Sequence, residues 1–375
     1  MTYKPKTYHI KTFGCAANEV DSSTIVGILE AVGYQFEEDM EKANLVIINT
    51  CSVRQKSEDK VYGLGKIFHR MPNRPFVVLA GCMVGSVTGE RRRYVFDELK
   101  NRTPWVNLYI NPDQINELPT LLDKEFPQDF ERKYPKGEHA YVNISYGCDN
   151  FCRFCVVPFA RGGERSRTRK EILNEIKKLA KKGYKHITLC GQNVNSWDLE
   201  TNEKFKIRAG SDQKLPFAGL LREVHEIEGV EKIDFISSNP FDFTEDLIQT
   251  LKLPKIDNYI HIAVQSGNND VLKSMNRRHT IEDFIALINQ VKKVRPDMKF
   301  GTDIIVGFPG ETRAQFNDTV ELFKQVPFQV AFISIYSARK GTPAAELYED
   351  DVPLVEKKKR HAELMEVWKQ TKKPS

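Results

Sequence analysis

Short apolar segments alternate with amphipathic helical segments along most of the chain. In the first third, strands are predicted at 8–13, 44–49 and 76–80, and helices at 20–31 and 58–69. Parallel strands cannot be joined by a tight hairpin, so strands separated by helices of this length form a parallel sheet with crossover helices. The pattern therefore predicts an α/β fold that begins with a βαβαβ unit.

The same alternation resumes beyond residue 140 with longer units. Strands are predicted around Val142, Ile187, Ile233, Ile260, Phe300 and Ala331. Capping-box patterns, Thr168 with Glu171 and Thr312 with Gln315, mark the starts of two of the intervening helices. Repeated βα units of this kind curl into a barrel, so we predict a partial (βα)6 barrel of the TIM type. Its ligands should bind beyond the carboxyl ends of the strands.

A charged stretch separates the two parts of the chain. Apolar periodicity fades there, and Pro127 and Pro135 interrupt the sequence. This composition is typical of a connection between domains. We place the first domain at 1–130, the linker at 131–139 and the second domain at 140–375.

Composition is ordinary for a globular protein. Hydrophobic residues make up 40% and charged residues 29% of the 375 residues, which disfavours disorder over most of the length. No apolar run reaches membrane-spanning length, and the first ten residues lack the apolar segment of a secretory signal. We therefore expect a cytoplasmic protein with no membrane partner. The net charge of +5 permits an acidic partner such as RNA without requiring one.

Cysteines with the spacing CxxxCxxC follow the strand predicted around Val142: Cys148, Cys152 and Cys155. Thiols in a reducing compartment serve as ligands or pack in the core. Three thiolates on a four-iron cubane leave one iron free to chelate the amino and carboxylate groups of a small molecule. A structural zinc site requires a fourth ligand, usually nearby in sequence, and the next histidine, His186, lies far along the chain. A zinc site is therefore disfavoured.

At this motif the sequence resembles the radical S-adenosylmethionine superfamily, whose hallmark is the same spacing with an aromatic residue, here Phe154, before the third cysteine. The resemblance implies a [4Fe–4S] cluster that splits S-adenosylmethionine into methionine and a 5′-deoxyadenosyl radical. It also implies that residues at the ends of later strands contact this cofactor. The cofactor-binding candidates are Phe154, Gly191, Gln192, Asn193, Gln265, Ser266, Asp303 and Ile305.

A second set of cysteines comes directly after the predicted strands of the first domain: Cys15, Cys51 and Cys82. The carboxyl ends of neighbouring parallel strands lie side by side, so these loops could bring the three thiols together. The residues alone leave open a second cluster and three separately buried cysteines, because cysteine is among the most buried residue types. The seventh cysteine, Cys190, is interpreted as a packing residue.

The segments 12–15, 49–54 and 80–83 resemble the N-terminal domain of the methylthiotransferase family, in which three such cysteines hold an auxiliary [4Fe–4S] cluster. Ala16 and Ala17 depart from the Gln-Met that commonly follows the first of them. The resemblance implies a flavodoxin-like parallel-sheet domain followed by the partial barrel. The small C-terminal TRAM β-barrel that usually ends members of this family is expected to be absent.

Further segments, 58–61, 163–167 and 191–196, resemble the MiaB branch of that family, which modifies isopentenylated adenosine beside the tRNA anticodon. The resemblance implies a transferase in which one S-adenosylmethionine donates the methyl group and a second yields the radical. The implied partners are the tRNA anticodon stem-loop, an electron donor such as flavodoxin or ferredoxin, and sulfur-donor machinery. We expect a monomer.

Basic residues beside the cysteine motif are candidates for RNA contact or for internal ion pairs: Arg161, Arg165, Arg167 and Arg169. Arg165 and Arg167 are favoured for RNA because they lie in a segment that resembles the family. The basic segment 356–373 is interpreted mainly as a packed terminal helix, with an RNA-touching face as the alternative.

Alternative functions remain within the same cysteine pattern. One is a methylthiotransferase that acts on threonylcarbamoyladenosine in tRNA or on a ribosomal-protein aspartate. Another is a non-catalytic iron-sulfur protein that transfers electrons or binds RNA. The open coordination site of a three-cysteine cluster argues against the non-catalytic protein.

Overall fold

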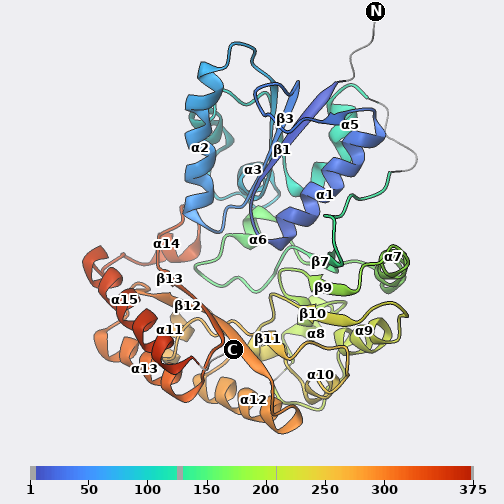
Figure 1. The fold of residues 1–375 in the computed structure, drawn as a ribbon. Helices are drawn as coiled ribbons and strands as arrows, with labels where there is room; N and C mark the ends of the chain where they lie inside the picture. The colour runs from blue at the N-terminus through green and yellow to red at the C-terminus, as the bar shows by residue number, and fades with distance from the viewer. Residues whose placement is uncertain (1–5, 125–129, 208, 373–375) are drawn as a thin grey trace, which may run out of the picture. The chain divides into compact units, whose positions relative to one another are not determined.

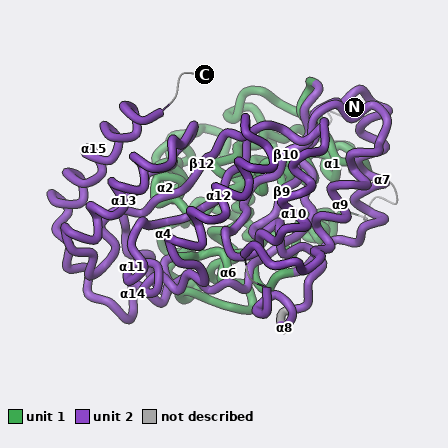
Figure 2. Tube along the Cα trace, turned by 90° about the horizontal axis from the view of Figure 1, so that it is seen from below, with its two compact units in different colours: residues 1–137, 155–164 green, residues 138–154, 165–375 purple. Residues whose placement is uncertain are grey.

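The computed structural model describes residues 6–124, 130–207 and 209–372 and divides into two units, coloured separately in Figure 2. One unit comprises Met1–Gly137 with Cys155–Glu164, and the other comprises Glu138–Phe154 with Arg165–Ser375. The ten residues from Cys155, the third cysteine of the CxxxCxxC motif, to Glu164 were assigned to the second domain from the sequence but group with the first unit.

A parallel sheet forms the first unit (Figure 1). Its strands are β1 (Thr7–Phe13), β2 (Gln35–Phe36), β3 (Leu45–Thr50), β4 (Phe76–Gly81) and β5 (Leu108–Ile110). They lie in the order β2-β1-β3-β4-β5, which is the flavodoxin-like arrangement. Every residue of the central strand β3 is buried, as expected for a parallel strand covered on both faces. The predicted fold class is therefore confirmed for this unit.

Helices cover both faces of this sheet. They are α1 (Ala16–Ala31), α2 (Gln55–Arg70), α3 (Cys82–Thr88), α4 (Phe96–Arg102), η1 (Pro112–Glu117), α5 (Leu118–Leu121) and α6 (Val157–Ala160). Side chains alternate between the faces of a strand, so Val46 and Ile48 of β3 join one apolar cluster while Ile47 joins the other. Figure 1 shows α2 on one side of β1 and β3 and α1 on the other.

A partial barrel of parallel strands forms the second unit. Its strands are β6 (His139–Asn143), β9 (His186–Cys190), β10 (Lys232–Phe235), β11 (Tyr259–His261), β12 (Lys299–Val306) and β13 (Val330–Ile335). They form two parallel sheets, β6-β9-β10 and β11-β12-β13. A parallel bridge between Ser238 and Ile262 connects the two. All strands predicted for the barrel are thus present, beside a small antiparallel pair, β7 (Ser145–Tyr146) with β8 (Arg165–Ser166).

The helices of the second unit flank these strands. They are α7 (Arg169–Lys181), η2 (Val194–Ser196), α8 (Thr201–Lys204), α9 (Pro216–His225), η3 (Pro240–Asp242), α10 (Glu245–Thr250), α11 (Asn269–Ser274), α12 (Ile281–Val294), α13 (Arg313–Gln325), α14 (Pro343–Leu347) and α15 (Leu354–Thr371). Both predicted capping boxes are present, at Thr168 before α7 and at Thr312 before α13.

The terminal helix α15 packs against α13 and β13. Leu364 is fully buried, and the indole Nε1 of Trp368 donates a hydrogen bond to the Phe328 carbonyl at 2.9 Å. Lys357 and Arg360 are buried as well, so two of the basic residues in this segment belong to the packed face of the helix. The interpretation of 356–373 as a packed helix is confirmed for its described residues.

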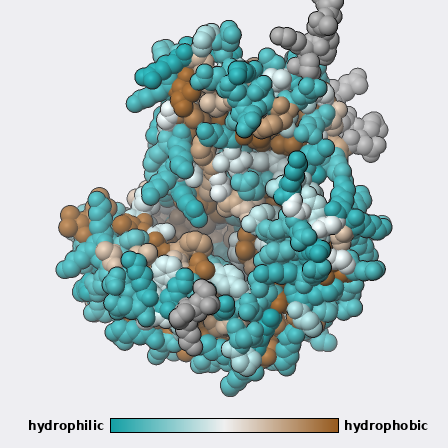
Figure 3. All heavy atoms as spheres, viewed as in Figure 1, coloured by the Kyte–Doolittle hydropathy of each residue, from teal (hydrophilic) through white to brown (hydrophobic). Residues whose placement is uncertain are grey.

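The surface view in Figure 3 is largely hydrophilic, with apolar patches. One patch lies where α15 begins, and Leu347, Leu354 and Val355 are exposed there. Among the helices that the structure describes, none combines the length and apolar character needed to span a bilayer.

Candidate iron-sulfur and cofactor sites

The first unit places three thiols at the carboxyl end of its sheet, those of Cys15, Cys51 and Cys82. Phe13 of β1 pairs with Thr50 of β3, and Thr50 pairs in turn with Gly81 of β4. These three residues are therefore aligned side by side across the neighbouring strands β1, β3 and β4. Cys51 and Cys82 directly follow Thr50 and Gly81 in sequence, and Cys15 follows Phe13 after one further residue. The three cysteines share one edge of the sheet, as the sequence predicted.

The three thiols influence one another's ionisation. A hydrogen bond between Cys51 and Cys15 lowers the pKa of Cys15 and raises the pKa of Cys51. Burial raises the pKa of Cys82, and the nearby charge of Arg161 opposes this rise. Cys51 and Cys82 are buried, whereas Cys15 is exposed. The site thus holds one thiol that ionises readily beside two that are shielded from water.

Two buried asparagines tie the loop after β1 to the end of β3. The Asn18 side-chain oxygen accepts a hydrogen bond from the Cys15 amide at 3.3 Å, and its Nδ2 donates to the Asn49 side-chain oxygen at 3.1 Å. Asn49 Nδ2 donates in return to the Asn18 carbonyl at 2.8 Å. This reciprocal pair fixes the backbone at Cys15 relative to β3. Asn49 begins the segment 49–54 that resembles the family, whereas Asn18 was not predicted from the sequence.

Arg161 contacts the third cysteine of this set. It follows α6, and its Nε lies 3.1 Å from Cys82 Sγ. Its Nη2 forms an ion pair with Asp21 Oδ2 of α1 at 2.7 Å. Both side chains are almost completely buried. Arg161, a candidate for RNA contact in the sequence analysis, therefore lies inside the first unit.

The loop that carries Cys148 and Cys152 is held in the second unit by backbone bonds. The Arg153 amide donates to the Met275 carbonyl at 3.0 Å, and the Ala344 amide donates to the Arg153 carbonyl at 2.9 Å. Gly147 has φ +69° and Phe151 has φ +46°, so the loop turns through left-handed conformations. Phe154 packs against the apolar cluster that contains Met275 and Phe308.

An arginine also contacts this second set of cysteines. Arg277 Nη1 donates to Cys152 Sγ at 3.3 Å, and Nη2 donates to the Ala263 carbonyl. Cys155 groups with the first unit, where the Val157 amide donates to its Sγ at 3.4 Å. Cys148 and Cys152 are each 8% exposed, so thiolates there are largely shielded from water.

Sets made of cysteine alone suit iron-sulfur clusters. In the described part of the chain, no group of three or more His, Cys, Asp or Glu residues is arranged to bind one metal ion. The thiolates of a cubane bind separate irons, so they lie further apart than the ligands of a single ion. The alignment of Cys15, Cys51 and Cys82 along one edge of the first sheet fits a set of cluster ligands. The N–H groups that Arg161 and Arg277 direct at cysteine sulfurs fit as well, since N–H donors to sulfur are a recurrent feature of such sites.

Gly191 and Asn193, two candidates for cofactor contact, shape the loop after β9. A Cβ added at Gly191 would lie 2.4 Å from Ser145 Oγ and 3.1 Å from Val194 Cγ1, so a larger residue there would displace these side chains. Asn193 is fully buried, and its Nδ2 donates to Ser196 Oγ and to Asp242 Oδ2. Gln192 between them is partly exposed. The Gln192 side chain is thus partly accessible to solvent, and its contact with the cofactor stays a prediction.

Candidates on later strands are brought together along β12. Gln265, at φ +79°, donates its amide to the Asp303 carbonyl at 2.9 Å and accepts from the Ile305 amide at 3.0 Å. Ser266 is fully buried. Ile305 packs against the same apolar cluster as Phe154. Five of the predicted residues thus share one region of the barrel, and their contacts with S-adenosylmethionine stay predictions.

The basic residues after the cysteine motif differ in their surroundings. Arg167 Nη1 donates to the Asn143 carbonyl at 2.8 Å and pairs with Glu175 at 2.7 Å. Arg169 pairs with Glu223. Arg165, in β8, is exposed. A partly buried ion pair therefore holds Arg167 and an exposed ion pair holds Arg169, whereas Arg165 has access to solvent.

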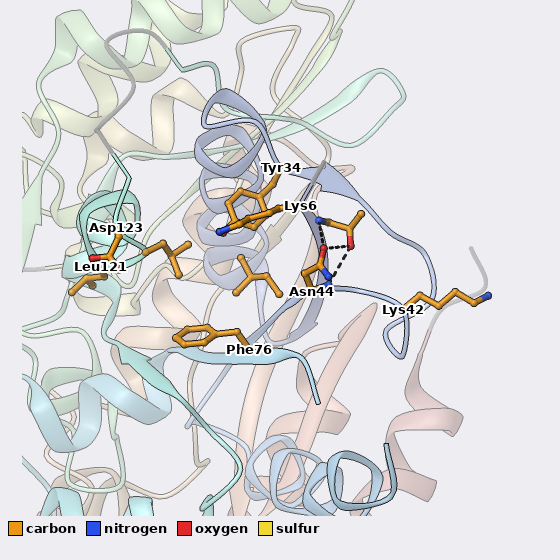
Figure 4. Close-up of a pocket in the computed structure, with 10 residues that line it drawn as sticks. Lys6, Tyr34, Lys42, Asn44, Phe76, Leu121 and Asp123 are labelled. Carbon is orange, nitrogen blue, oxygen red and sulfur yellow. Dashed lines mark hydrogen bonds between the residues drawn. The ribbon is translucent and has the colours of Figure 1, made fainter. Parts of the chain in front are cut away.

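A cavity of about 800 Å³ lies at the opposite end of the first sheet (Figure 4). Lys6, Asn44 and Phe76 line it at or near the amino ends of β1, β3 and β4. Apolar side chains such as Leu121 form much of the rest of its wall. No cysteine is among its lining residues, so the cavity is separate from the iron-sulfur site.

Two family models match the chain. The Radical SAM superfamily matches residues 142–323, and Uncharacterized protein family UPF0004 matches residues 7–109. A tRNA-2-methylthio-N(6)-dimethylallyladenosine synthase from Clostridium tetani is 43% identical, over 96% of this chain and 80% of the relative. The enzyme of the same name from Natranaerobius thermophilus is 40% identical, over 92% of this chain and 77% of the relative.

Solved structures show the same fold at low sequence identity. The radical S-adenosylmethionine methyltransferase TsrM from Kitasatospora setae superposes with a TM-score of 0.61 at 14% identity, over 91% of this chain and 77% of that chain. The cobalamin-dependent S-adenosylmethionine radical enzyme OxsB gives 0.55 at 13% identity, over 96% of this chain and 56% of that chain. Both likenesses concern the fold alone.

Proposed function

Because the chain belongs to the family of tRNA-2-methylthio-N6-dimethylallyladenosine synthases, we propose that it transfers a methylthio group to isopentenylated adenosine beside the tRNA anticodon. The observation that carries the proposal is the pair of cysteine sets, one at the level edge of the first sheet and one in the CxxxCxxC loop. A single set would suffice for radical formation alone. A second set offers a site from which sulfur can be delivered.

Radical S-adenosylmethionine enzymes of this family use S-adenosylmethionine and two [4Fe–4S] clusters. Cys148, Cys152 and Cys155 would hold one cluster, and a second set would hold the auxiliary cluster: Cys15, Cys51 and Cys82. When bound, these groups supply the methyl group, the sulfur and a carbon-centred radical. Radical chemistry suits the substrate, because the aromatic C–H of adenine is neither acidic nor easily displaced.

Residues of the chain position and shield these groups. Arg277 donates to Cys152 Sγ, and the backbone of Arg153 fixes the loop through its bonds to Met275 and Ala344. The apolar cluster around Phe154 excludes water from one side of the loop. In the first unit, Asn18 and Asn49 hold the backbone at Cys15.

The RNA partner follows from the same proposal. An anticodon loop is single-stranded, so its bases can splay out and enter a protein site. Exposed Arg165 is suited to a phosphate contact. The enzyme would act as a monomer in the cytoplasm, where thiols stay reduced, with flavodoxin or ferredoxin as electron donor and a separate sulfur-donor system.

The test is anaerobic reconstitution with iron and sulfide, followed by incubation with dithionite, S-adenosylmethionine and isopentenylated tRNA. We expect about eight irons per chain, as two four-iron clusters require, together with 5′-deoxyadenosine and methylthiolated nucleoside by mass spectrometry. Methylthiolated threonylcarbamoyladenosine, or a modified ribosomal-protein aspartate, would redirect the assignment of substrate. Absence of 5′-deoxyadenosine would support a non-catalytic iron-sulfur protein.

Cysteine variants separate the two sites. Cys152→Ala should abolish both products, whereas Cys51→Ala should abolish the methylthiolated nucleoside and retain 5′-deoxyadenosine. Each should lose about four irons. Cys190→Ala is the matched control, because this buried thiol lies in neither set and its Sγ lies 3.5 Å from the Thr188 carbonyl oxygen. Unchanged methylthiolation in Cys51→Ala would refute the auxiliary-cluster assignment.

A further inference from the structure

Arg161 is a buried arginine with two partners of different charge. Its Nε lies 3.1 Å from Cys82 Sγ, and its Nη2 lies 2.7 Å from Asp21 Oδ2. The Arg161 side chain is 3% exposed and that of Asp21 is 5% exposed. A carboxylate alone would neutralise the charge of one buried guanidinium but cannot accept from all of its five N–H groups, and the structure directs the Nε–H at a thiol.

The position of Arg161 is set by close packing of α6 on α3. A Cβ added at Gly85 of α3 would lie 2.1 Å from the Ala160 carbonyl oxygen, so the two helices approach as near as glycine permits. Cys82 begins α3, and Arg161 directly follows α6. Asp21 reaches the guanidinium from α1. Three helices therefore hold the guanidinium beside the thiol.

The charge of a bound cluster explains why a cation is useful there. A [4Fe–4S]²⁺ core with three thiolate ligands carries a net charge of about −1, and one added electron makes it about −2. A buried guanidinium that donates N–H to a ligand sulfur stabilises the more negative state more strongly, which raises the reduction potential. A buried carboxylate next to that guanidinium acts in the opposite direction.

We propose that Arg161 is a positioning residue of the auxiliary cluster, which holds Cys82 and raises the reduction potential of the cluster, while Asp21 limits that rise. The proposal rests on the assignment of Cys15, Cys51 and Cys82 to this cluster under the proposed function. It assigns opposite electrostatic effects to two residues that form one ion pair. A merely structural pair would not produce opposite effects.

The test is a redox titration of the full-length chain followed by electron paramagnetic resonance, without tRNA. Replacing Cys148, Cys152 and Cys155 by Ala leaves only the auxiliary cluster to be observed. Dithionite supplies one electron to the cluster, and no bond forms or breaks. We expect Arg161→Gln to lower the reduction potential and Asp21→Asn to raise it. Each change should amount to about tenfold in the reduction equilibrium, which is about 59 mV for one electron.

Control variants separate charge from folding. Arg74→Gln removes one positive charge from an exposed site before β4, at the opposite end of that strand from Cys82, and should leave the potential unchanged. Arg161→Lys retains the charge and should recover part of the shift. The double variant Arg161→Gln with Asp21→Asn leaves no unpaired buried charge, and its potential should lie below that of Asp21→Asn alone.

Several results would overturn the proposal. One is an unchanged reduction potential in the Arg161→Gln variant, provided that this variant retains about four irons per chain. Another is a shift of the same sign in Arg161→Gln and Asp21→Asn. If Arg161→Gln fails to hold a cluster, the reduction potential of Asp21→Asn still tests the proposal, since that variant keeps the guanidinium. A potential in Asp21→Asn that does not rise would then contradict it. Failure of the parent chain to methylthiolate tRNA would refute the proposed function without changing these potentials.

Discussion

Gly85 of α3 and Ala160 of α6 meet so closely that a Cβ on Gly85 would lie 2.1 Å from the Ala160 carbonyl oxygen. Gly85→Ala should therefore push α6 away from α3 and displace Arg161 from Cys82. Overpacking of this kind costs about 1–3 kcal/mol, and we expect that loss in urea unfolding together with reduced iron content in the first unit.

The matched control for Gly85→Ala is Gly63→Ala. Gly63 lies inside α2, and a Cβ there would meet no atom within 4 Å. Alanine is the better helix former, so this variant should gain about 0.5–1 kcal/mol. Equal stability of the two variants would show that the approach of α6 to α3 is not tight.

The terminal helix α15 is anchored by a buried ion pair. Arg360 Nη1 lies 2.9 Å from Glu311 Oε2, and these side chains are 6% and 1% exposed. Burial raises the pKa of Glu311, although the Gly307 amide and Arg360 oppose the rise. Arg360→Met leaves this carboxyl group buried without its cation and should cost about 3–5 kcal/mol in urea unfolding.

Lys359 supplies the comparison for Arg360 on the same helix. It is exposed, so Lys359→Met should change stability by less than about 0.5 kcal/mol. A comparable loss in both variants would contradict the assignment of the ion pair as the anchor of α15.

Arg165 and Arg167 should respond differently to substitution. Arg165→Gln removes an exposed charge and should weaken binding of an anticodon stem-loop, lowering the salt dependence of log K by about 0.7–0.9 if it contacts one phosphate. Arg167→Gln breaks the ion pair with Glu175 and should instead lower the stability of the second unit. Fluorescence anisotropy at several salt concentrations and urea unfolding measure the two effects. A salt slope unaffected by Arg165→Gln would remove this residue from the RNA contact.

His279 should make the protein sensitive to acid. Burial lowers the pKa of His279 well below its usual value, and the charge of Arg277 lowers it further. The unfolded chain takes up a proton near pH 6.5 that the folded chain does not bind there, so stability is present above about pH 6.5 and falls as the pH decreases toward the folded-state pKa.

Replacing the His279 imidazole tests the predicted loss of stability at acidic pH. The free energy of unfolding of His279→Gln, measured at pH 7.5 and pH 5, should change less between the two than that of the parent chain. Burial, followed by the charge of His186, also lowers the pKa of His139. His139 is present in both the parent chain and His279→Gln, so its contribution to the pH dependence is the same in the two. An identical pH dependence in the two proteins would mean that folding does not lower the pKa of His279.

The sequence by itself determined the α/β class, the parallel strands, the capped helices and the position of each cysteine set after its strand. Apolar periodicity and capping residues act over a few neighbouring positions, so they can be read without knowledge of the fold. The level edge formed by the ends of β1, β3 and β4 also followed, because parallel neighbours must end side by side.

Only the tertiary structure decided which polar side chains meet at these sites. Arg161 lies 79 positions from Cys82 and 140 from Asp21, and Asn18 lies 31 from Asn49. The sequence grouped Arg161 with Arg165 and Arg167 because they are neighbours along the chain, whereas packing of α6 on α3 buries Arg161 inside the first unit. Such contacts depend on the approach of elements that are distant in sequence, and no local pattern records that approach.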